Sequence, residues 1–165
     1  MPAKQVYIAL GSNLGDKKQN LHRALVRMQD EEVHVVKYSS IYETEPQDVR
    51  DQPWFLNMVA ECETRYFPSQ LLAVLQRIER QMGRLRAGVP PRGPRPIDLD
   101  ILMFGRMKIK TPKLELPHPR MLGRRFVLEP LLEIAPGLRH PATGVELAAA
   151  LTALKNQLVK KIGPL

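Results

Sequence analysis

Two aspartates separated by one apolar residue, Asp98 and Asp100, lie within the apolar run 97–104. A short apolar run of this kind predicts a strand, in which residues i and i+2 point to the same face. We therefore expect the two carboxylates side by side, with Cα atoms about 6.5 Å apart, and their apolar neighbours in a core. Adjacent carboxylates favour a site for Mg²⁺, which prefers oxygen ligands. The alternative is a solvated face that protects an edge strand from aggregation.

The length and charge of the chain limit the classes of protein to consider. With 165 residues, 44% hydrophobic and 25% charged, the sequence predicts one globular domain over residues 1–165. The net charge of +8 predicts an anionic partner, which can be nucleic acid, an anionic membrane surface or a phosphate-rich small molecule. Charge alone does not choose among these three.

The single cysteine, Cys62, excludes an intrachain disulfide and a CxxC metal site. No N-terminal apolar segment resembles a signal peptide, and no run approaches the roughly 18 apolar residues of a membrane span. These features predict a cytoplasmic protein in which Cys62 is a buried structural thiol of a strand.

The order of the predicted elements indicates an α+β fold. Apolar alternation and β-branched residues predict strands at 5–10, 33–42, 54–64, 97–104 and 107–110, and helical periodicity predicts helices at 17–28, 68–82 and 147–158. Asp16 is expected to cap the first helix, and Gly11 is expected in the turn after the first strand. We expect a mostly antiparallel sheet with the helices gathered on one side, in a split βαβ arrangement.

Basic residues cluster around the strand that carries the two aspartates. They comprise Arg84, Arg86, Arg92 and Arg95, together with His118 and Arg124 in a later segment. Paired carboxylates that hold Mg²⁺ against phosphates, with cations on the remaining oxygens, are typical of phosphoryl and pyrophosphoryl transfer. The alternative is a solvated basic face that binds RNA, although no aromatic residue interleaves the arginines at 77–95. Neither GxxxxGK[ST] nor GxGxxG is present.

Several short motifs in this order resemble the 6-hydroxymethyl-7,8-dihydropterin pyrophosphokinase family of folate biosynthesis. They are Ala9-Leu10-Gly11-Ser12-Asn13-Leu14-Gly15, Ser39-Ser40-Ile41-Tyr42-Glu43-Thr44-Glu45-Pro46, Asp51-Gln52-Pro53 with Phe55-Leu56-Asn57, Gly83-Arg84-Leu85-Arg86, Gly93-Pro94-Arg95 with Asp98-Leu99-Asp100, and Pro117-His118-Pro119 with Arg124 and Phe126. Each motif is weak alone, but together they cover nearly the whole chain.

The resemblance implies a ferredoxin-like fold and an ATP-dependent diphosphotransferase. ATP would donate its β,γ-pyrophosphoryl group to the hydroxymethyl group of the dihydropterin and leave as AMP. Asp98 and Asp100 would hold two Mg²⁺ ions, and Arg84 and Arg95 would complete the catalytic set. By the same resemblance the pterin would contact Thr44, Pro46, Phe55, Asn57 and Phe126, and ATP would contact Gln76, Glu79, Arg84, Arg86, Arg95, Lys113, His118 and Arg124.

The resemblance further implies a monomer with small-molecule substrates, ATP and hydroxymethyl-dihydropterin, and no nucleic-acid or membrane partner. We also expect a stand-alone enzyme, because 165 residues leave no room for a fused second folate enzyme. Loops near residues 12–16, 44–53 and 84–95 would close over the substrates and exclude water. The chain departs from the family pattern at Gln47-Asp48, Pro91-Arg92 and Pro96, which affects these closing loops. A basic α+β RNA-binding domain and a DxD-dependent nucleotidyl or glycosyl transferase are the competing hypotheses.

Overall fold

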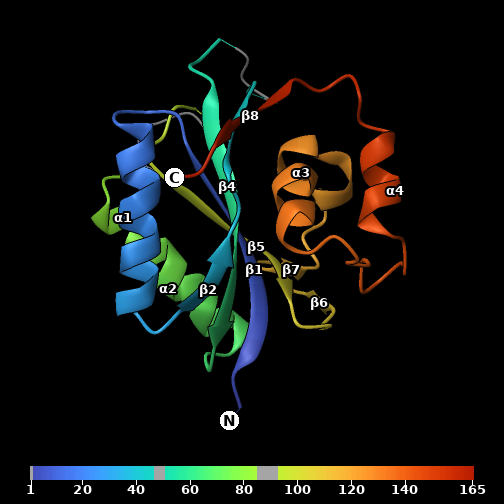
Figure 1. Ribbon diagram of the computed structural model, residues 1–165. Helices are drawn as coiled ribbons and strands as arrows, with labels where there is room; N and C mark the ends of the chain where they lie inside the picture. The colour runs from blue at the N-terminus through green and yellow to red at the C-terminus, as the bar shows by residue number, and fades with distance from the viewer. Residues whose placement is uncertain (1, 47–50, 85–92) are drawn as a thin grey trace.

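A single antiparallel sheet forms the centre of the molecule (Figure 1). The computed structural model describes residues 2–46, 51–84 and 93–165, and within them the sheet has six strands. In spatial order these are β5 (Asp98–Phe104), β1 (Lys4–Ser12), β4 (Phe55–Thr64), β3 (Ile41–Thr44) and β8 (Val159–Gly163), while β2 (His34–Tyr38) also pairs with β4. The predicted α+β fold with a mostly antiparallel sheet is confirmed.

Helices cover both faces of the sheet, so the expectation of helices on one side was wrong (Figure 1). Helices α1 (Lys17–Asp30) and α2 (Pro68–Gln81) pack on one face, and the 3₁₀ turn η1 (Met121–Gly123), α3 (Arg125–Ile134) and α4 (Leu147–Thr152) lie on the other. The reason is that the central strands are apolar on both faces: Val6 and Ile8 face α1 and α2, whereas Tyr7 and Val59 belong to the opposite core. A two-stranded ribbon of β6 (Ile109–Lys110) and β7 (Glu115–Leu116) follows β5.

Local sequence signals account for the helices on the first face. The side chain of Asp16 accepts a hydrogen bond from the Gln19 N–H at 3.1 Å, which confirms the predicted cap of α1. The buried stripe of this helix is Leu21, Ala24, Leu25 and Met28, as the helical spacing predicts. In β4, which these helices cover, Cys62 is fully buried and burial raises the pKa of its thiol to about 12. Cys62 is therefore the structural thiol that the sequence predicted.

Two predicted elements have different boundaries in the structure. The strand expected at 33–42 is divided into β2 and β3 at Ser39, whose Oγ accepts the Val59 N–H at 3.0 Å. This side chain takes the place of a backbone partner and interrupts the strand. The helix expected at 147–158 ends at Thr152, because the following segment crosses to β3 and forms β8.

A β-bulge in β5 sets the faces of that strand. Tyr7 pairs with Met103 and Ile8 with Ile101, so Leu102 has no partner in β1. As a result Leu102 and Met103 both join the core beneath α3, while Ile101 and Phe104 join the core beneath α1 and α2. In the described part of the chain, no helix has the length and apolar character required to span a bilayer.

Candidate active site

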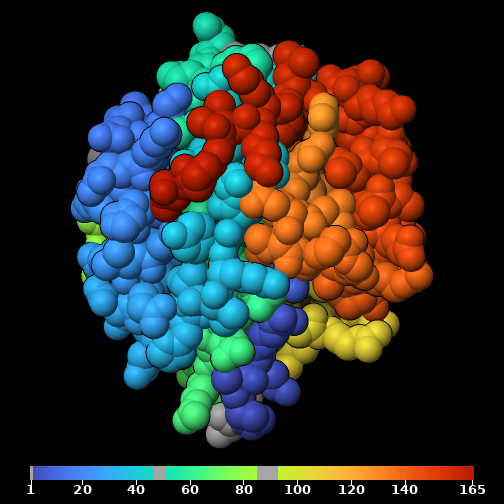
Figure 2. All heavy atoms as spheres, viewed as in Figure 1, coloured from blue at the N-terminus to red at the C-terminus, as the bar shows by residue number. Residues whose placement is uncertain are grey.

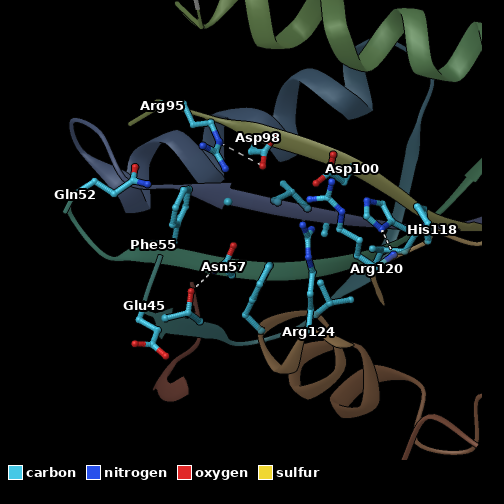
Figure 3. Close-up of a pocket in the computed structure, with 18 of the residues that line it drawn as sticks. Glu45, Gln52, Phe55, Asn57, Arg95, Asp98, Asp100, His118, Arg120 and Arg124 are labelled. Atoms are coloured by element: carbon cyan, nitrogen blue, oxygen red, sulfur yellow. Dashed lines mark hydrogen bonds and ion pairs between the residues drawn. The ribbon is translucent and has the colours of Figure 1, made fainter. Parts of the chain in front are cut away.

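A pocket of about 350 Å³ opens between the sheet and the N-terminal end of α3 (Figure 3). Strands β1, β3, β4 and β5 supply one side of it, and the segment from His118 to Val127 supplies the other. The lining residues are Ala9, Leu10, Gly11, Thr44, Glu45, Gln52, Phe55, Asn57, Arg84, Arg95, Asp98, Asp100, Leu102, His118, Pro119, Arg120, Arg124, Phe126 and Val127.

The floor of the pocket is made by small residues of β1. Asp98 pairs with Gly11, which pairs on its other side with Asn57, and Asp100 pairs with Ala9. Because neighbouring strands lie about 4.8 Å apart, Asp98 and Asn57 are separated by two strand spacings, about 10 Å. A Cβ atom on Gly11 would lie 2.6 Å from Asn57 Oδ1, so the absence of a side chain at Gly11 leaves space for the Asn57 amide above the strand. Gly11 thus lies within the strand, and its assignment to a turn was wrong.

The two aspartates lie on the same face of β5, as the alternation predicts, and both line the pocket (Figure 3). Leu99, between them, points into the core on the opposite face. Although β5 is an edge strand, these carboxylates face a pocket rather than bulk solvent. The Leu99 N–H, on the outer edge of the strand, donates to Glu79 Oε2 at 2.8 Å. The interpretation of the aspartates as a solvated edge is therefore not favoured.

Arginines and aspartates form a partly buried network at one end of the pocket. Arg84 Nη1 lies 2.5 Å from Asp98 Oδ1 and 2.7 Å from Glu79 Oε2, and Arg95 Nε lies 3.4 Å from Asp98 Oδ2. Burial alone would lower the pKa of Arg84, but the charges of Asp98 and Glu79 outweigh it and raise this pKa. Arg84 therefore stays charged and neutralises part of the acidic cluster.

The pKa of Asp100 lies above its ordinary value. Burial and the negative charges of Asp98 and Glu79 raise the pKa of Asp100 to about 7, although Arg124 and Arg84 oppose this shift. Among the described residues no group of three or more His, Cys, Asp and Glu side chains could hold a metal. Two carboxylates with substrate phosphates nevertheless fit Mg²⁺, which commonly uses one or two protein carboxylates and retains other oxygen ligands.

Aromatic and amide side chains form the other end of the pocket (Figure 3). The Asn57 amide nitrogen donates to Thr44 Oγ1 at 2.5 Å. The Arg95 guanidinium lies 4.8 Å from the centre of the Phe55 ring, and the Arg124 guanidinium lies 5.4 Å from that of Phe126. Two rings and an oriented amide suit a flat heterocycle with hydrogen-bonding groups on its edge.

His118 lies beside the aspartates, and its backbone N–H donates to the Leu102 carbonyl at 2.8 Å. Its Nδ1 accepts the Arg120 N–H at 3.2 Å, which leaves Nε2 as the protonated nitrogen of a neutral ring. Burial and the positive charges of Arg124 and Arg120 lower the pKa of His118 to about 4. At neutral pH this ring is a neutral donor and not a cation.

The structure brings most of the predicted site residues together, with some exceptions. Pro46 is buried, Gln76 is half-buried on α2, and Lys113 is exposed in the turn between β6 and β7; none of the three lines the pocket. Glu79 also lies behind the pocket wall, where it contacts Arg84 and the Leu99 N–H. Arg86 lies outside the described residues, as do Gln47-Asp48 and Pro91-Arg92. Roles for these residues stay predictions.

Other pocket residues were not predicted from the sequence. They are Glu45, Gln52, Leu102, Pro119, Arg120 and Val127, in addition to the floor residues of β1. Gln52 accepts a hydrogen bond from Asn13 Nδ2 at 2.8 Å, and Asn13 Oδ1 accepts the Arg95 N–H at 2.8 Å. The resemblance motifs contain Gln52 and Asn13, and Arg120 follows the His118 motif directly, so proximity to the motifs was the available signal.

Comparison with known proteins identifies the family to which the chain belongs. The family model for 7,8-dihydro-6-hydroxymethylpterin-pyrophosphokinase matches residues 7–136. The 2-amino-4-hydroxy-6-hydroxymethyldihydropteridine pyrophosphokinase of Bacillus subtilis is 48% identical over 141 residues, which are 85% of this chain and 83% of that protein. The RNA-binding alternative finds no support in these matches.

Several other relatives are much longer proteins, of which this chain spans about a fifth to a quarter. The folic acid synthesis protein fol1 of Pneumocystis carinii is 43% identical over 159 residues, or 96% of this chain, and the matched part is 21% of the relative's length. The chain is also similar in structure to Plasmodium falciparum HPPK-DHPS, crystallised with pteroate, with a TM-score of 0.74 and 14% sequence identity. The superposition covers 92% of this chain and 42% of the Plasmodium chain, and it shows that the two share a fold. The family model matches most of the chain, and the Bacillus relative is 48% identical over most of both proteins. The chain therefore belongs to the 7,8-dihydro-6-hydroxymethylpterin-pyrophosphokinase family.

Proposed function

We propose that this chain transfers the pyrophosphoryl group of ATP to the hydroxymethyl group of 6-hydroxymethyl-7,8-dihydropterin and releases AMP, a step of tetrahydrofolate biosynthesis. The observation that carries the proposal is the shared pocket, which has the Asp98–Asp100 pair at one end and the Phe55, Asn57 and Phe126 side chains at the other. The distance of about two strand spacings between Asp98 and Asn57 leaves room for a ring whose hydroxymethyl group reaches the aspartates.

The aromatic end of the pocket would hold the pterin. Phe55 and Phe126 would contact the faces of its ring, and stacking of this kind contributes about 0.5–1.5 kcal/mol beyond the buried area. Asn57 donates to Thr44, so its Oδ1 remains oriented as an acceptor for an N–H group on the pterin edge. Thr44 therefore selects which end of the amide faces the ring.

The charged end of the pocket would hold the phosphates of ATP. Asp98 and Asp100 would be the protein ligands of two Mg²⁺ ions, which supply positive charge beside the phosphates when bound. Arg84 and Arg95 are already held by Asp98 and lie in position to neutralise phosphate oxygens. Arg95 Nε forms an ion pair with Asp98 Oδ2 at 3.4 Å but makes no hydrogen bond within the described residues, which is consistent with a donor that could turn to a phosphate oxygen.

In the proposed reaction the substrate hydroxyl oxygen forms a bond to the β-phosphorus of ATP. The bond from that phosphorus to the oxygen shared with the α-phosphate breaks, AMP leaves with this oxygen, and the hydroxyl proton is released. The contribution of the chain is to align the hydroxyl group and the β-phosphorus and to hold cations around the transferred phosphates. His118 and Arg124 lie beside the same end of the pocket and would contact phosphate or leaving AMP.

The test is production of AMP from ATP and the hydroxymethyl-dihydropterin in the presence of Mg²⁺, followed by chromatography. We expect stoichiometric AMP and pterin pyrophosphate, and no AMP when the pterin is omitted. Formation of ADP, or of inorganic pyrophosphate with a nucleotidylated product, would contradict the proposal. A monomer of one domain over residues 1–165, two Mg²⁺ ions and a cytoplasmic location are further parts of this proposal.

A further inference from the structure

A residue near the C-terminus, Gln157, holds the turn that precedes α3. Its side-chain nitrogen donates to the Gly123 carbonyl at 2.8 Å, and its Oε1 accepts the Arg125 N–H at 2.8 Å. The main-chain carbonyl of Gln157 also accepts a hydrogen bond from Arg125 Nη1 at 2.8 Å. These bonds bracket Arg124 on both sides, and Arg124 is a pocket residue.

The bond to the Arg125 N–H replaces a missing helix cap. The N-cap position of α3 is Arg124, which makes no side-chain capping bond. The first N–H groups of a helix have no partner within it, and a capping oxygen typically contributes about 0.5–2 kcal/mol. Gln157 supplies this oxygen from a segment 32 residues further along the chain.

The same C-terminal segment also contacts the opposite wall of the pocket. Val159 pairs with Thr44 in the β8–β3 ladder, and the Leu158 carbonyl accepts the Glu45 N–H at 3.4 Å. The segment lies on the molecular surface, next to β3 (Figures 1 and 2). Residues 157–159 therefore connect the wall that carries Arg124 and Phe126 to the wall that carries Thr44 and Glu45.

We infer that Gln157 is a positioning residue of the site, which acts through the backbone of residues 123–125 on the side chains of Arg124 and Phe126. The expected effect on the KM for ATP rests on the proposed function, whereas the capping of the Arg125 N–H by Gln157 does not depend on it. Gln157 lies beyond residues 7–136, the part that the family model covers, so the inference concerns a contact outside the region that defines the family.

The first test compares Gln157→Met with wild type. Methionine keeps the length of the side chain and removes both side-chain hydrogen bonds, and Asn156→Ala, at the exposed neighbouring position, is the matched control. We expect the KM for ATP to rise about tenfold in Gln157→Met, the loss expected for one to two hydrogen bonds, and to stay unchanged in Asn156→Ala. Wild-type KM values in Gln157→Met would overturn the inference.

A ligand-free measurement tests the cap independently of catalysis. Hydrogen exchange of the Arg125 amide should be at least tenfold faster in Gln157→Met, while amides of α1 keep their protection. Gln157→Glu retains the accepting oxygen and should restore most of the protection at Arg125. Equal exchange at Arg125 in wild type and Gln157→Met would refute the cap, even if Gln157→Met were destabilised.

A double-mutant cycle separates positioning from general destabilisation. If Gln157 acts through Arg124, the pair Gln157→Met and Arg124→Ala raises the KM for ATP no further than Arg124→Ala alone. Additive effects would show that Gln157 does not act through Arg124. A wild-type protein that forms no AMP would refute the proposed function, whereas the exchange experiment would still decide the cap.

Discussion

Replacing Gly11 with alanine adds one methyl group to the floor of the pocket. The new Cβ atom would lie 2.6 Å from Asn57 Oδ1 and 3.5 Å from Phe55 Cδ1. The first distance is shorter than real Cβ contacts, so the Asn57 amide has to move. The amide nitrogen is held by Thr44 Oγ1 at 2.5 Å, and a movement of Asn57 therefore breaks or distorts that bond.

The size of the effect follows from the hydrogen bonds of Asn57. A displaced Asn57 would no longer present its Oδ1 to the pterin, and a ring N–H buried without that partner costs about 1–3 kcal/mol, which corresponds to a fall in pterin affinity of roughly 5- to 150-fold. The distorted Asn57–Thr44 bond costs folding stability about 0.5–1.5 kcal/mol. The backbone of Gly11 is an ordinary strand conformation, so alanine there causes no backbone strain and reduces the entropy of the unfolded chain by about 0.4–1 kcal/mol. Pterin binding should consequently suffer more than folding stability.

The assay is the KM for the pterin in the AMP-release reaction, together with the melting temperature. Gly137→Ala is the matched control, because a Cβ there would meet no atom within 4 Å and its φ is not left-handed. We expect a raised KM for the pterin only in Gly11→Ala. Wild-type pterin affinity in Gly11→Ala would show that the ring does not lie over this floor.

Three further predictions concern titratable groups. Asp100→Asn should lower turnover about 100-fold or more. It should nevertheless raise the melting temperature in metal-free buffer at pH 8, because burial raises the pKa of Asp100 from 3.8 to about 7, so that its ionisation costs stability progressively between these pH values and in full above pH 7. A lower melting temperature would contradict this. For His118, whose pKa is lowered to about 4, folding stability should fall as pH drops from about 6.5 to about 4, since the unfolded chain takes up a proton there first. An NMR titration of the imidazole checks this pKa, and His118→Gln should flatten the pH dependence of the melting temperature in that window. Cys62, with a pKa of about 12 and no exposed surface, should not react with Ellman's reagent until guanidinium unfolds the protein, and rapid reaction of the native protein would refute its burial.

Local signals in the sequence were sufficient for several features of the fold and site. The cap at Asp16 depends on a contact three residues away, and the shared face of Asp98 and Asp100 depends only on the two-residue repeat of a strand. The resemblance motifs brought together Phe55 and Arg95, which the structure confirms as neighbours in one pocket. The first two predictions succeeded because neighbouring residues determine them, whereas Phe55 and Arg95 lie 40 residues apart and only the family resemblance brought them together.

Features that depend on distant pairing could not be predicted in this way. Gly11 reads as a turn glycine in sequence, and its place in the floor follows from its pairing with Asp98 and Asn57. Helices were expected on one side of the sheet only, yet α3 covers Val59 on the other side completely, and nothing near Val59 in the sequence indicates that helix. Likewise, the segment around Gln157 continues a helical pattern locally but finds its partners at β3 and before α3.

The two covered faces of the sheet have a consequence for how this sequence can change over evolutionary time. Along β1 and β5, residues such as Ile8 and Leu99 contribute to the apolar core beneath α1 and α2, whereas Ala9 and Asp100 belong to the pocket. Volume-conserving exchanges in that core change stability by modest amounts and do not alter the pocket surface. During evolution, substitutions in the core on one face of the sheet can therefore change the thermal stability of the protein, while the residues that recognise the substrate on the other face stay the same.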